Sequence, residues 1–431
     1  MHVDIGAALA SVADPGVEED RLDDLDERVR AAHERIAAGR ADGEFGYAAL
    51  NLPERTDPAE IRAAVEPVAE AESVLTVGIG GSALGARTIT SALADEPERH
   101  VVLDNVDPEH VERTLSDLPL SETAINVVSR SGTTAETLAN FLVVRDAYED
   151  AGVDWTDLTV VTTGDEGPLR ELADAEDLPT LPVPEGVPGR FSALSAVGLV
   201  PPAILGVDIE GVLDGGAAVA DDLGPSLQDT PAYAYGAVAH QLERAGASVN
   251  AVMPYAERLE SFAEWTAQLF AESLGKDGQG QAPVRALGAT DQHSQLQLYR
   301  AGPADKVVTF VRPGERPEVA IPSADHEALS YLDGVGLGEL IDAEYDATVA
   351  SLPAAGRPAV EIEIDRLDPQ GVGELLYAME AACVLMGELA EVETFTQPAV
   401  EWGKRATRAL IQGETTEETR VVDERTNYVV D

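Results

Sequence analysis

The feature that most constrains the fold is a series of short apolar runs separated by longer amphipathic stretches. The runs are rich in the residue types that favour β-strands. They cover residues 73–77, 101–103, 124–128, 158–161, 249–253, 307–311 and 360–364. Strands that alternate with helical segments predict a parallel sheet with helices on both faces. Because the runs form two series, the sequence predicts an α/β protein with two doubly wound domains.

The length of the chain agrees with two domains, since 431 residues exceed what one compact core usually holds. The first sixty residues are acidic and helical in pattern, and residues 211–224 are rich in Gly and Asp, which suggests a boundary. A final helix is expected from Pro398, followed by a polar tail after Gly413. The predicted division is a helical segment, a first domain, a second domain and a C-terminal helix with tail, at residues 1–60, 61–210, 211–395 and 396–431.

The net charge of the chain is −50, with 79 acidic residues and only three lysines, Lys276, Lys306 and Lys404. In dilute buffer so many like charges work against the compact state. Molar salt shortens the Debye length to roughly 3 Å and screens this repulsion. The composition therefore indicates adaptation to high salt, with a basic binding partner as the alternative. Nucleic-acid binding is not expected, because no basic stripe is present.

The cysteine content and the N-terminus predict a cytoplasmic protein. Cys383 is a single cysteine inside an apolar run, so we interpret it as a core residue that forms no internal disulfide. The N-terminus has neither the cationic start nor the long apolar core of a secretory signal. No apolar run approaches the length needed to cross a membrane.

The first motif with chemical content is the glycine-rich loop of residues 78–85, which directly follows a predicted strand and includes Gly81 and Ser82. Glycines allow the backbone to turn tightly and to approach a phosphate, while the amides of the next helix point at the anion.

The same loop also resembles a dinucleotide-binding fingerprint. Gly78, Gly80 and Ala83 match the pattern G-x-G-x-x-A, and Asp104 ends the next strand about twenty residues later. The motif alone therefore leaves a sugar-phosphate enzyme, a nicotinamide-dependent dehydrogenase and a structural turn open.

A second loop favours the sugar phosphate. Residues 129–137 again lie between a strand and a helix, and they carry Ser129, Ser131, Thr133 and Thr134. Four hydroxyl groups and helix amides suit a phosphate monoester, which needs many donors around three oxygens. The alternative is helix capping, but capping needs one hydroxyl.

The segment from Tyr255 to Lys276 is predicted to be an amphipathic helix. Gln268 and Glu272 lie one turn apart on one face, and Gly275 suits the C-terminal cap. Glu272 would then occupy the last turn, near the negative end of the helix dipole. A carboxylate there can have its proton affinity raised, which suits a general base. Taken alone, Glu272 is one of 79 acidic residues, and a surface role is the alternative.

Two further segments carry groups that could transfer protons. His293 lies in a polar stretch with Asp291, which is near enough in the chain to orient its imidazole. Lys404 closes the segment that begins at Gln397. In a chain that uses arginine almost everywhere, a retained lysine suggests a role that arginine cannot fill, because an ammonium can lose its proton more readily.

In this order the segments resemble the glucose-6-phosphate isomerase family from about Val74 to Lys404, in a haloarchaeal-like form. Residues 189–198 resemble the family's Gly-Gly-Arg-[Phe/Tyr]-Ser motif, and they contain Arg190. The chain departs from that motif at Val187-Pro188, where the family usually has another glycine.

The resemblance implies two sugar-isomerase (SIS) domains with the site between them, acting on glucose 6-phosphate and fructose 6-phosphate through a cis-enediol. Glu272 would be the base, Arg190 would stabilise the enediolate, and His293 and Lys404 would open the sugar ring. The remaining candidates would bind the phosphate and the sugar: Gly81, Ser82, Ser129, Ser131, Thr133, Thr134, Gln268 and Gln397. The family also implies a homodimer in which the neighbouring subunit supplies the histidine, with no metal or nucleotide cofactor. A sugar-phosphate-sensing SIS protein without catalysis is the non-enzymatic alternative.

Overall fold

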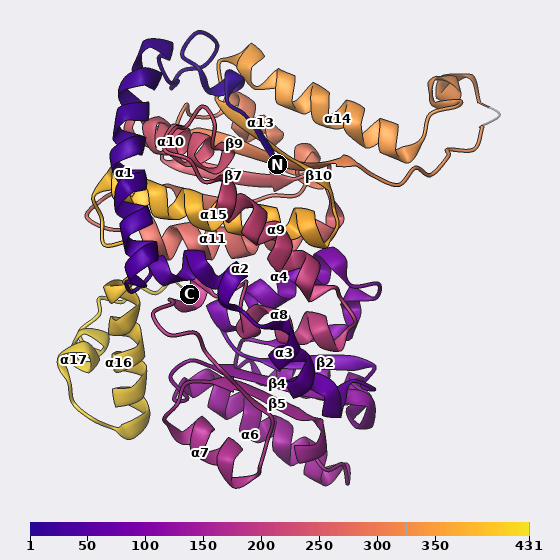
Figure 1. The fold of residues 1–431 in the computed structure, drawn as a ribbon, viewed down its shortest axis with the longest axis vertical. Coiled ribbons are helices and arrows are strands. Elements are labelled where there is room, and N and C mark those ends of the chain that lie inside the picture. The colour runs from indigo at the N-terminus through magenta and orange to yellow at the C-terminus, as the bar shows by residue number, and fades with distance from the viewer. Residues whose placement is uncertain (324–325, 431) are drawn as a thin grey trace.

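The computed structural model describes residues 1–323 and 326–430 of the chain, and it contains two lobes that are each built on a five-stranded sheet (Figure 1). The first sheet has the order β3-β2-β4-β5-β6, and all of its strands are parallel. Its strands are β2 (Ser73–Val77), β3 (His100–Leu103), β4 (Thr123–Ser129), β5 (Thr159–Thr163) and β6 (Thr180–Pro182). Every residue of β2, β4 and β5 is buried, as expected for a sheet covered on both faces.

The helices of the first lobe connect these strands, and the two candidate phosphate loops lie at one edge of the sheet. The helices are α4 (Leu84–Leu93), α5 (Pro108–Asp117), α6 (Ala135–Asp150) and α7 (Pro168–Ala175). Strands β2 and β4 are hydrogen-bonded neighbours, with Val77 opposite Val127. Because both strands run in one direction, the loops that follow them emerge side by side at the carboxyl edge, where ligands bind in open α/β sheets.

The second sheet has the order β1-β10-β9-β7-β8. Its strands are β1 (His2–Asp4), β7 (Val249–Pro254), β8 (Ala282–Arg285), β9 (Lys306–Glu315) and β10 (Ala359–Arg366). Strand β1 is antiparallel to β10, and the other pairs are parallel. The helical pattern assigned to the first sixty residues therefore omits a strand. That strand has only three residues, too few for a period-two pattern to be recognised.

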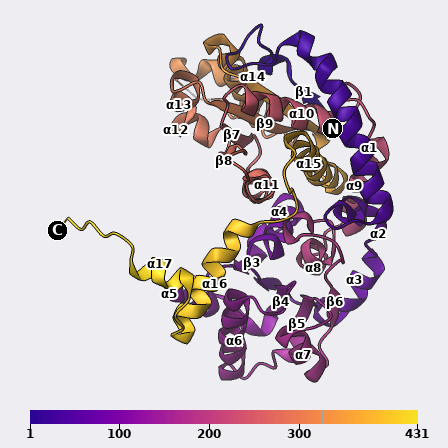
Figure 2. The same cartoon turned by 90° about the vertical axis from the view of Figure 1, so that its left-hand side faces the viewer.

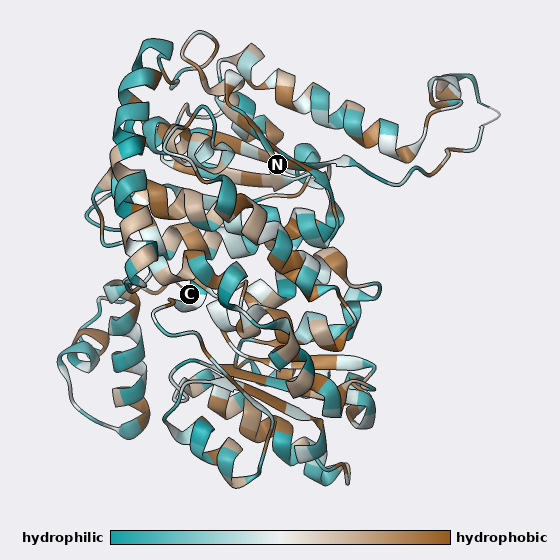
Figure 3. Cartoon of the chain, in the orientation of Figure 1, coloured by the Kyte–Doolittle hydropathy of each residue, from teal (hydrophilic) through white to brown (hydrophobic). Residues whose placement is uncertain are grey.

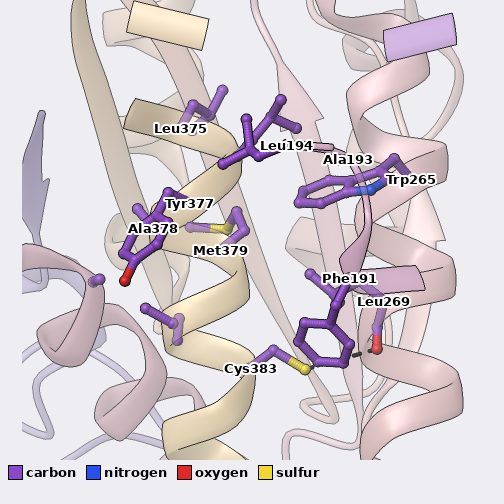
Figure 4. Packing of buried hydrophobic residues seen from close by; sticks show 14 of the residues in the cluster. Phe191, Ala193, Leu194, Trp265, Leu269, Leu375, Tyr377, Ala378, Met379 and Cys383 are labelled. Carbon is purple, nitrogen blue, oxygen red and sulfur yellow. Dashed lines mark hydrogen bonds between the residues drawn. The ribbon is translucent and has the colours of Figure 1, made fainter. Parts of the chain in front are cut away.

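A layer of helices separates the two sheets (Figure 2). Its members include α8 (Ala196–Ile204), α9 (Ile209–Asp222), α11 (Glu260–Leu274) and α15 (Pro369–Ala390), while α10 (Pro231–Arg244) lies beside the second sheet and packs on α15. Helix α15 is buried along most of its length, which explains its nearly continuous apolar sequence. Figure 4 shows Cys383 of this helix packed beside Phe191 and Leu269. Burial raises the pKa of the Cys383 thiol to about 12, so it is a core residue, as the sequence predicted.

Residues 211–224, whose composition suggested a boundary, form most of α9 rather than a loop. A Cβ atom at Gly215 would collide with the backbone of Gln370, and one at Gly373 would collide with the carbonyl of Val212. The glycines therefore allow α9 and α15 to approach closely, a use of glycine that composition cannot distinguish from a linker.

Several elements lie outside the two sheets and the central layer. Helix α1 (Leu22–Asp42) runs along one side of the molecule, and an arm of residues 316–323 and 326–336 projects before α14 (Leu337–Ser351) (Figure 1). The chain ends in α16 (Pro398–Gln412) and α17 (Glu417–Asp423), which pack on each other and extend away from the lobes (Figure 2). The expected final helix is present, but the expected polar tail contains α17. The shorter helices are α2 (Leu52–Arg55), α3 (Pro58–Val65), α12 (Thr290–Ser294) and α13 (Leu296–Ala301).

Hydropathy follows this arrangement. Figure 3 shows hydrophobic residues concentrated in the strands and the central helices, while the outer helices carry hydrophilic residues toward solvent. Within the described residues, no helix combines the length and the apolar character that a membrane span requires. The two-domain parallel-sheet α/β architecture predicted from the sequence is confirmed.

Candidate active site

The candidate base lies in the last turn of α11, which ends at Leu274 with Gly275 as its C-cap, as the sequence predicted. The Glu272 side chain is 26% exposed, so its carboxylate is accessible from outside. One turn earlier, the Gln268 amide nitrogen donates a hydrogen bond of 3.0 Å to Glu272 Oε1. The helix thus carries a partly shielded carboxylate whose orientation is fixed by a neighbour on the same face.

Arg190 faces this carboxylate from the short 3₁₀ turn of residues 189–191. Its guanidinium group is buried, with a side-chain exposure of 1%. Nη1 lies 3.4 Å from Glu272 Oε2 and donates to Gln397 Oε1 at 3.0 Å. Nε donates to Ser273 Oγ at 2.7 Å, and Nη2 donates to the Thr394 carbonyl at 2.7 Å. One side chain thus connects three segments that are far apart in the sequence.

The electrostatics of Arg190 suit the stabilisation of an anion. Burial lowers the pKa of the guanidinium, and the Glu272 carboxylate opposes that change. A guanidinium remains charged at any physiological pH. A buried, fully oriented cation needs little reorganisation when negative charge develops beside it. The Val187-Pro188 departure from the family motif leaves this arrangement intact, since Pro188 has an ordinary extended backbone and its carbonyl accepts from Phe191 N–H.

The glycine-rich loop packs directly against these residues. Gly80 has a φ of +59°, and a Cβ atom there would collide with the Gln268 amide. A Cβ atom at Gly81 would collide with the backbone of Gly189 and Arg190. Two glycines of this loop are therefore required for close contact with other parts of the chain. Gln268 Oε1 is buried and accepts no hydrogen bond from any residue that the structure describes.

The hydroxyl-rich loop presents its donors at the start of α6. Ser129 Oγ lies 3.1 Å from Thr134 Oγ1, and Ser131 Oγ accepts from both the backbone N–H and the hydroxyl of Thr133, at 3.2 and 3.0 Å. Thr134 is the N-cap residue of α6, but its side chain makes no capping hydrogen bond. The first-turn amides of α6 thus receive no cap from this hydroxyl, so simple capping does not explain the four hydroxyl groups.

Comparisons with known proteins agree with this geometry. The family model described as phosphoglucose isomerase matches residues 64–296, more than half of the chain. A probable glucose-6-phosphate isomerase of Haloarcula marismortui is 78% identical over 425 residues, which cover 99% of this chain and 98% of that protein. The chain belongs to the phosphoglucose isomerase family.

Two solved structures share the fold of this phosphoglucose isomerase chain. A hypothetical protein of Thermus thermophilus superimposes with a TM-score of 0.85 at 36% identity, over 91% of this chain and 98% of that one. A glucose-6-phosphate isomerase of Chlamydia trachomatis superimposes with a TM-score of 0.81 at 21% identity, over 94% and 89% of the two chains. The resemblance inferred from the sequence is confirmed for both family and fold, and the family match does not support the dehydrogenase alternative.

Two residues that the phosphoglucose isomerase resemblance assigned to the site make no hydrogen bond or ion pair with Glu272 or Arg190 in the described part of the chain. His293 is exposed on α12, and its side chain makes no hydrogen bond or ion pair with another described residue. Asp291 does not orient it, because its carboxylate accepts hydrogen bonds from Leu287 N–H and Ser294 Oγ instead. Lys404, with 59% of its side chain exposed, pairs with Glu401 on α16.

The structure adds three residues that the sequence patterns did not single out for the site. Ser273 and Thr394 accept hydrogen bonds from Arg190, and Lys276 contacts the end of α11. Thr394 precedes α16 in an irregular segment, where no periodicity could have revealed it. For Lys276 a signal did exist, because lysine is so rare in this chain.

Proposed function

We propose that this chain catalyses the reversible interconversion of glucose 6-phosphate and fructose 6-phosphate, a step shared by glycolysis and gluconeogenesis. The observation that carries the proposal is the Glu272 carboxylate held between the Gln268 amide and the buried Arg190 guanidinium. This constellation lies in a chain 78% identical to a probable glucose-6-phosphate isomerase. A base beside a fixed cation suits proton abstraction next to a carbonyl group.

In the proposed mechanism Glu272 removes the C2 proton of the open-chain aldose. The electron pair of the C2–H bond forms the C1=C2 double bond, and the carbonyl electrons move to O1, which gives a cis-enediolate. Arg190 stabilises this developing negative charge. O1 gains a proton, O2 loses one, and Glu272 returns its proton to C1. Since C1 is reduced as C2 is oxidised, the reaction balances without an external oxidant or reductant.

The loops of the first lobe would bind the other end of the substrate. Their hydroxyl groups and backbone amides would surround the phosphate, with Gly81, Ser82, Ser129, Ser131, Thr133 and Thr134 as the binding residues. Gln268 and Gln397 would position the sugar, and the buried Oε1 of Gln268 supports this because it still lacks a donor among the described residues. Binding energy from the phosphate would then hold C1 and C2 against the base.

We propose further that the active form is a homodimer in which the histidine comes from the other subunit. The exposure of His293 and its lack of partners among the described residues support this. Apolar side chains are also exposed on the parts that project from the lobes. Ile411 of α16 is 78% exposed, and Tyr331 of the arm is 72% exposed. A second copy of this chain would cover these side chains. Lys404 would act with the histidine of the other subunit in opening the sugar ring.

The domain division and the location complete the proposal. Residues 61–210 and 211–395 would act as two SIS domains, with residues 1–60 and 396–431 as flanking segments. The enzyme would work in the cytoplasm, because its charged substrate does not diffuse across a membrane.

The experiment that tests the proposal uses purified protein, fructose 6-phosphate and deuterated water in molar potassium chloride, without nicotinamide. Glucose 6-phosphate with deuterium at C2 is expected, because the proton on Glu272 exchanges with solvent during the enediolate stage. A sugar-phosphate sensor would bind the substrate without exchange at carbon. If folded protein gives neither product nor exchange, the proposal fails.

A further inference from the structure

We infer that Lys276 positions the catalytic base by capping the carboxyl end of α11. Lys276 is one of only three lysines, and it lies four residues after Glu272. Its ammonium group donates to the Glu272 carbonyl at 2.8 Å and to the Ser273 carbonyl at 2.6 Å. The inference rests on the proposed role of Glu272, and it adds a residue that acts through that base without touching the substrate.

The end of α11 needs such a group. The last carbonyls of a helix have no partner within the helix, and a cation near them is favourable. Here the Gly275 amide bonds the Ala271 carbonyl and the Lys276 amide bonds the Leu274 carbonyl. Among the described residues, no backbone N–H group reaches the carbonyls of Glu272 and Ser273. The Lys276 ammonium therefore bonds the two carbonyls that the backbone leaves free.

These two carbonyls belong to the residues that matter for the site. Glu272 carries the carboxylate, and the Ser273 hydroxyl accepts the Arg190 Nε–H at 2.7 Å. One ammonium group thus fixes the backbone of the base and of the residue that orients the guanidinium. Because a misplacement of about 1 Å can lower a catalytic rate by about 100-fold, this backbone anchor is expected to affect turnover.

The contacts also explain why a lysine occupies this position. The ammonium group is compact, and it bonds two carbonyls of consecutive residues. Burial and the positive charge of Arg190 both lower the pKa of Lys276, so the position is electrostatically costly for a cation. A planar guanidinium would bring a second bulky cation close to Arg190. In a chain that otherwise uses arginine, this cost points to a specific role.

Lys306 offers a matched control. Lys306 is buried, with an exposed fraction of 6%, whereas Lys276 is half-buried. The Lys306 ammonium group donates to the Pro303 carbonyl at 2.9 Å and pairs with Asp305. Lys306 begins strand β9 in the second lobe and has no hydrogen bond or ion pair with Glu272, Ser273 or Arg190 in the described part of the chain. Its removal should affect stability alone.

The experiment compares Lys276→Met with Lys306→Met in molar potassium chloride. We would measure kcat, KM, the primary isotope effect on kcat with glucose 6-phosphate deuterated at C2, and the Kd of glucitol 6-phosphate, which has no carbonyl group. For K276M we expect kcat to fall by roughly 30-fold, the isotope effect to rise, and the Kd to stay within about twofold of the wild-type value. For K306M we expect kcat and the isotope effect of the wild type.

The opposite results overturn the inference. They are a K276M enzyme with wild-type kcat and isotope effect, a loss confined to KM and Kd, or equal changes in both variants. If K276M does not fold, the same measurements are made on Lys276→Arg, which keeps the positive charge. A K276R enzyme whose isotope effect exceeds that of the wild type supports the positioning role of Lys276. A K276R enzyme with the wild-type kcat and isotope effect contradicts this role.

The wild type and Glu272→Gln are assayed in parallel. A folded wild type that gives neither product nor exchange refutes the proposed function, and an E272Q enzyme with wild-type kcat removes the base on which the inference rests. An inactive E272Q together with a K276M enzyme of wild-type kcat refutes only the role of Lys276.

Discussion

The centre of the candidate site and its outer groups are built very differently. At the centre, Arg190 is buried, and its four hydrogen bonds reach α11, Gln397 and Thr394. At the outside, His293 has no partner among the described residues, and Lys404 pairs only with a neighbour on its own helix. The residues proposed for proton transfer therefore contact one another within one chain, whereas the groups proposed for ring opening do not contact them. This contrast suggests that a second subunit completes the site.

The largest effect is expected at the centre. Replacing Glu272 with glutamine removes the base but keeps the shape of the side chain, so kcat should fall by about 1,000-fold with KM nearly unchanged. Steady-state assays of both directions measure this. Exchange of the C2 proton with solvent should fall in parallel. An E272Q enzyme with unchanged turnover would remove Glu272 from the mechanism.

A smaller effect of a different kind is expected at the outside. For His293→Asn we expect kcat to fall by about 100-fold, and for Lys404→Met by about tenfold, because ring opening slows. The primary isotope effect at C2 should decrease in both, since a step that does not break the C2–H bond then limits the rate. E272Q and K276M should change it in the opposite direction. If the isotope effect rises in H293N, His293 takes part in the transfer of the C2 proton, together with Glu272 and Arg190.

Low salt should affect the projecting helices α16 and α17 before it affects the two lobes. The chain carries a net charge of −50, and α16 and α17 pack mainly on each other, so the outer parts have little apolar contact to oppose repulsion. Moving from about 3 M to about 0.1 M potassium chloride should lower activity about tenfold, and the proposed dimer should dissociate before the folded state is lost. Sedimentation and circular dichroism at each salt concentration follow the two events. Retention of full activity and fold in the dilute salt would refute the salt adaptation.

The smallest effect concerns one histidine in each lobe, the half-buried His100 of β3 and the buried His240 of α10. Burial lowers the pKa of His100 to about 3 and that of His240 to about 4. Between those values and about 6.5 the unfolded chain binds more protons than the folded one, so stability falls as the pH falls through this range. Each histidine should contribute up to about 1.4 kcal/mol per pH unit.

Urea unfolding at about pH 7.5 and about pH 5.5, at constant salt, tests this prediction. His100 is held by Thr76 and Thr90, with ring nitrogens 2.8 and 2.6 Å from their hydroxyl oxygens. A His100→Asn variant should lose part of the pH dependence. The comparison uses the change in unfolding free energy between the two pH values, because the substitution also alters two hydrogen bonds. Equal pH dependence in the two proteins would show that His100 is not buried in its neutral form.

Regular periodicity explains what the sequence predicted well. The seven apolar runs correspond to β2, β3, β4, β5, β7, β9 and β10, and the helix that carries Gln268 and Glu272 ends at the expected cap. Strands β1, β6 and β8 were missed, because they have three or four residues and lack adjacent β-branched apolar residues such as Val101 and Val102 of the equally short β3. The glycines of residues 211–224, which suggested a boundary, serve the close packing of α9 on α15, and the boundary itself stays a prediction.

In the candidate site, too, the sequence predicted the residues that a local pattern relates and missed the contacts that depend on the fold. Spacing along one helix relates Gln268 to Glu272, and family motifs supplied Arg190. The contacts of Arg190 with Ser273 and Thr394 depend on three segments meeting in space, which no local pattern encodes. The isolation of His293 likewise emerges only in three dimensions, because its neighbour Asp291 bonds the backbone of Leu287 instead.

The most direct test of a site shared between subunits is to mix two inactive variants. E272Q and H293N are unfolded together and refolded in equal amounts in molar salt, and activity is compared with that of wild type treated in the same way. If the base and the histidine come from different subunits, each mixed dimer has one intact site. Half of the dimers are mixed, so about a quarter of the wild-type activity should return. If both residues act within one chain, every site lacks one of them, and the mixture will stay as inactive as its components.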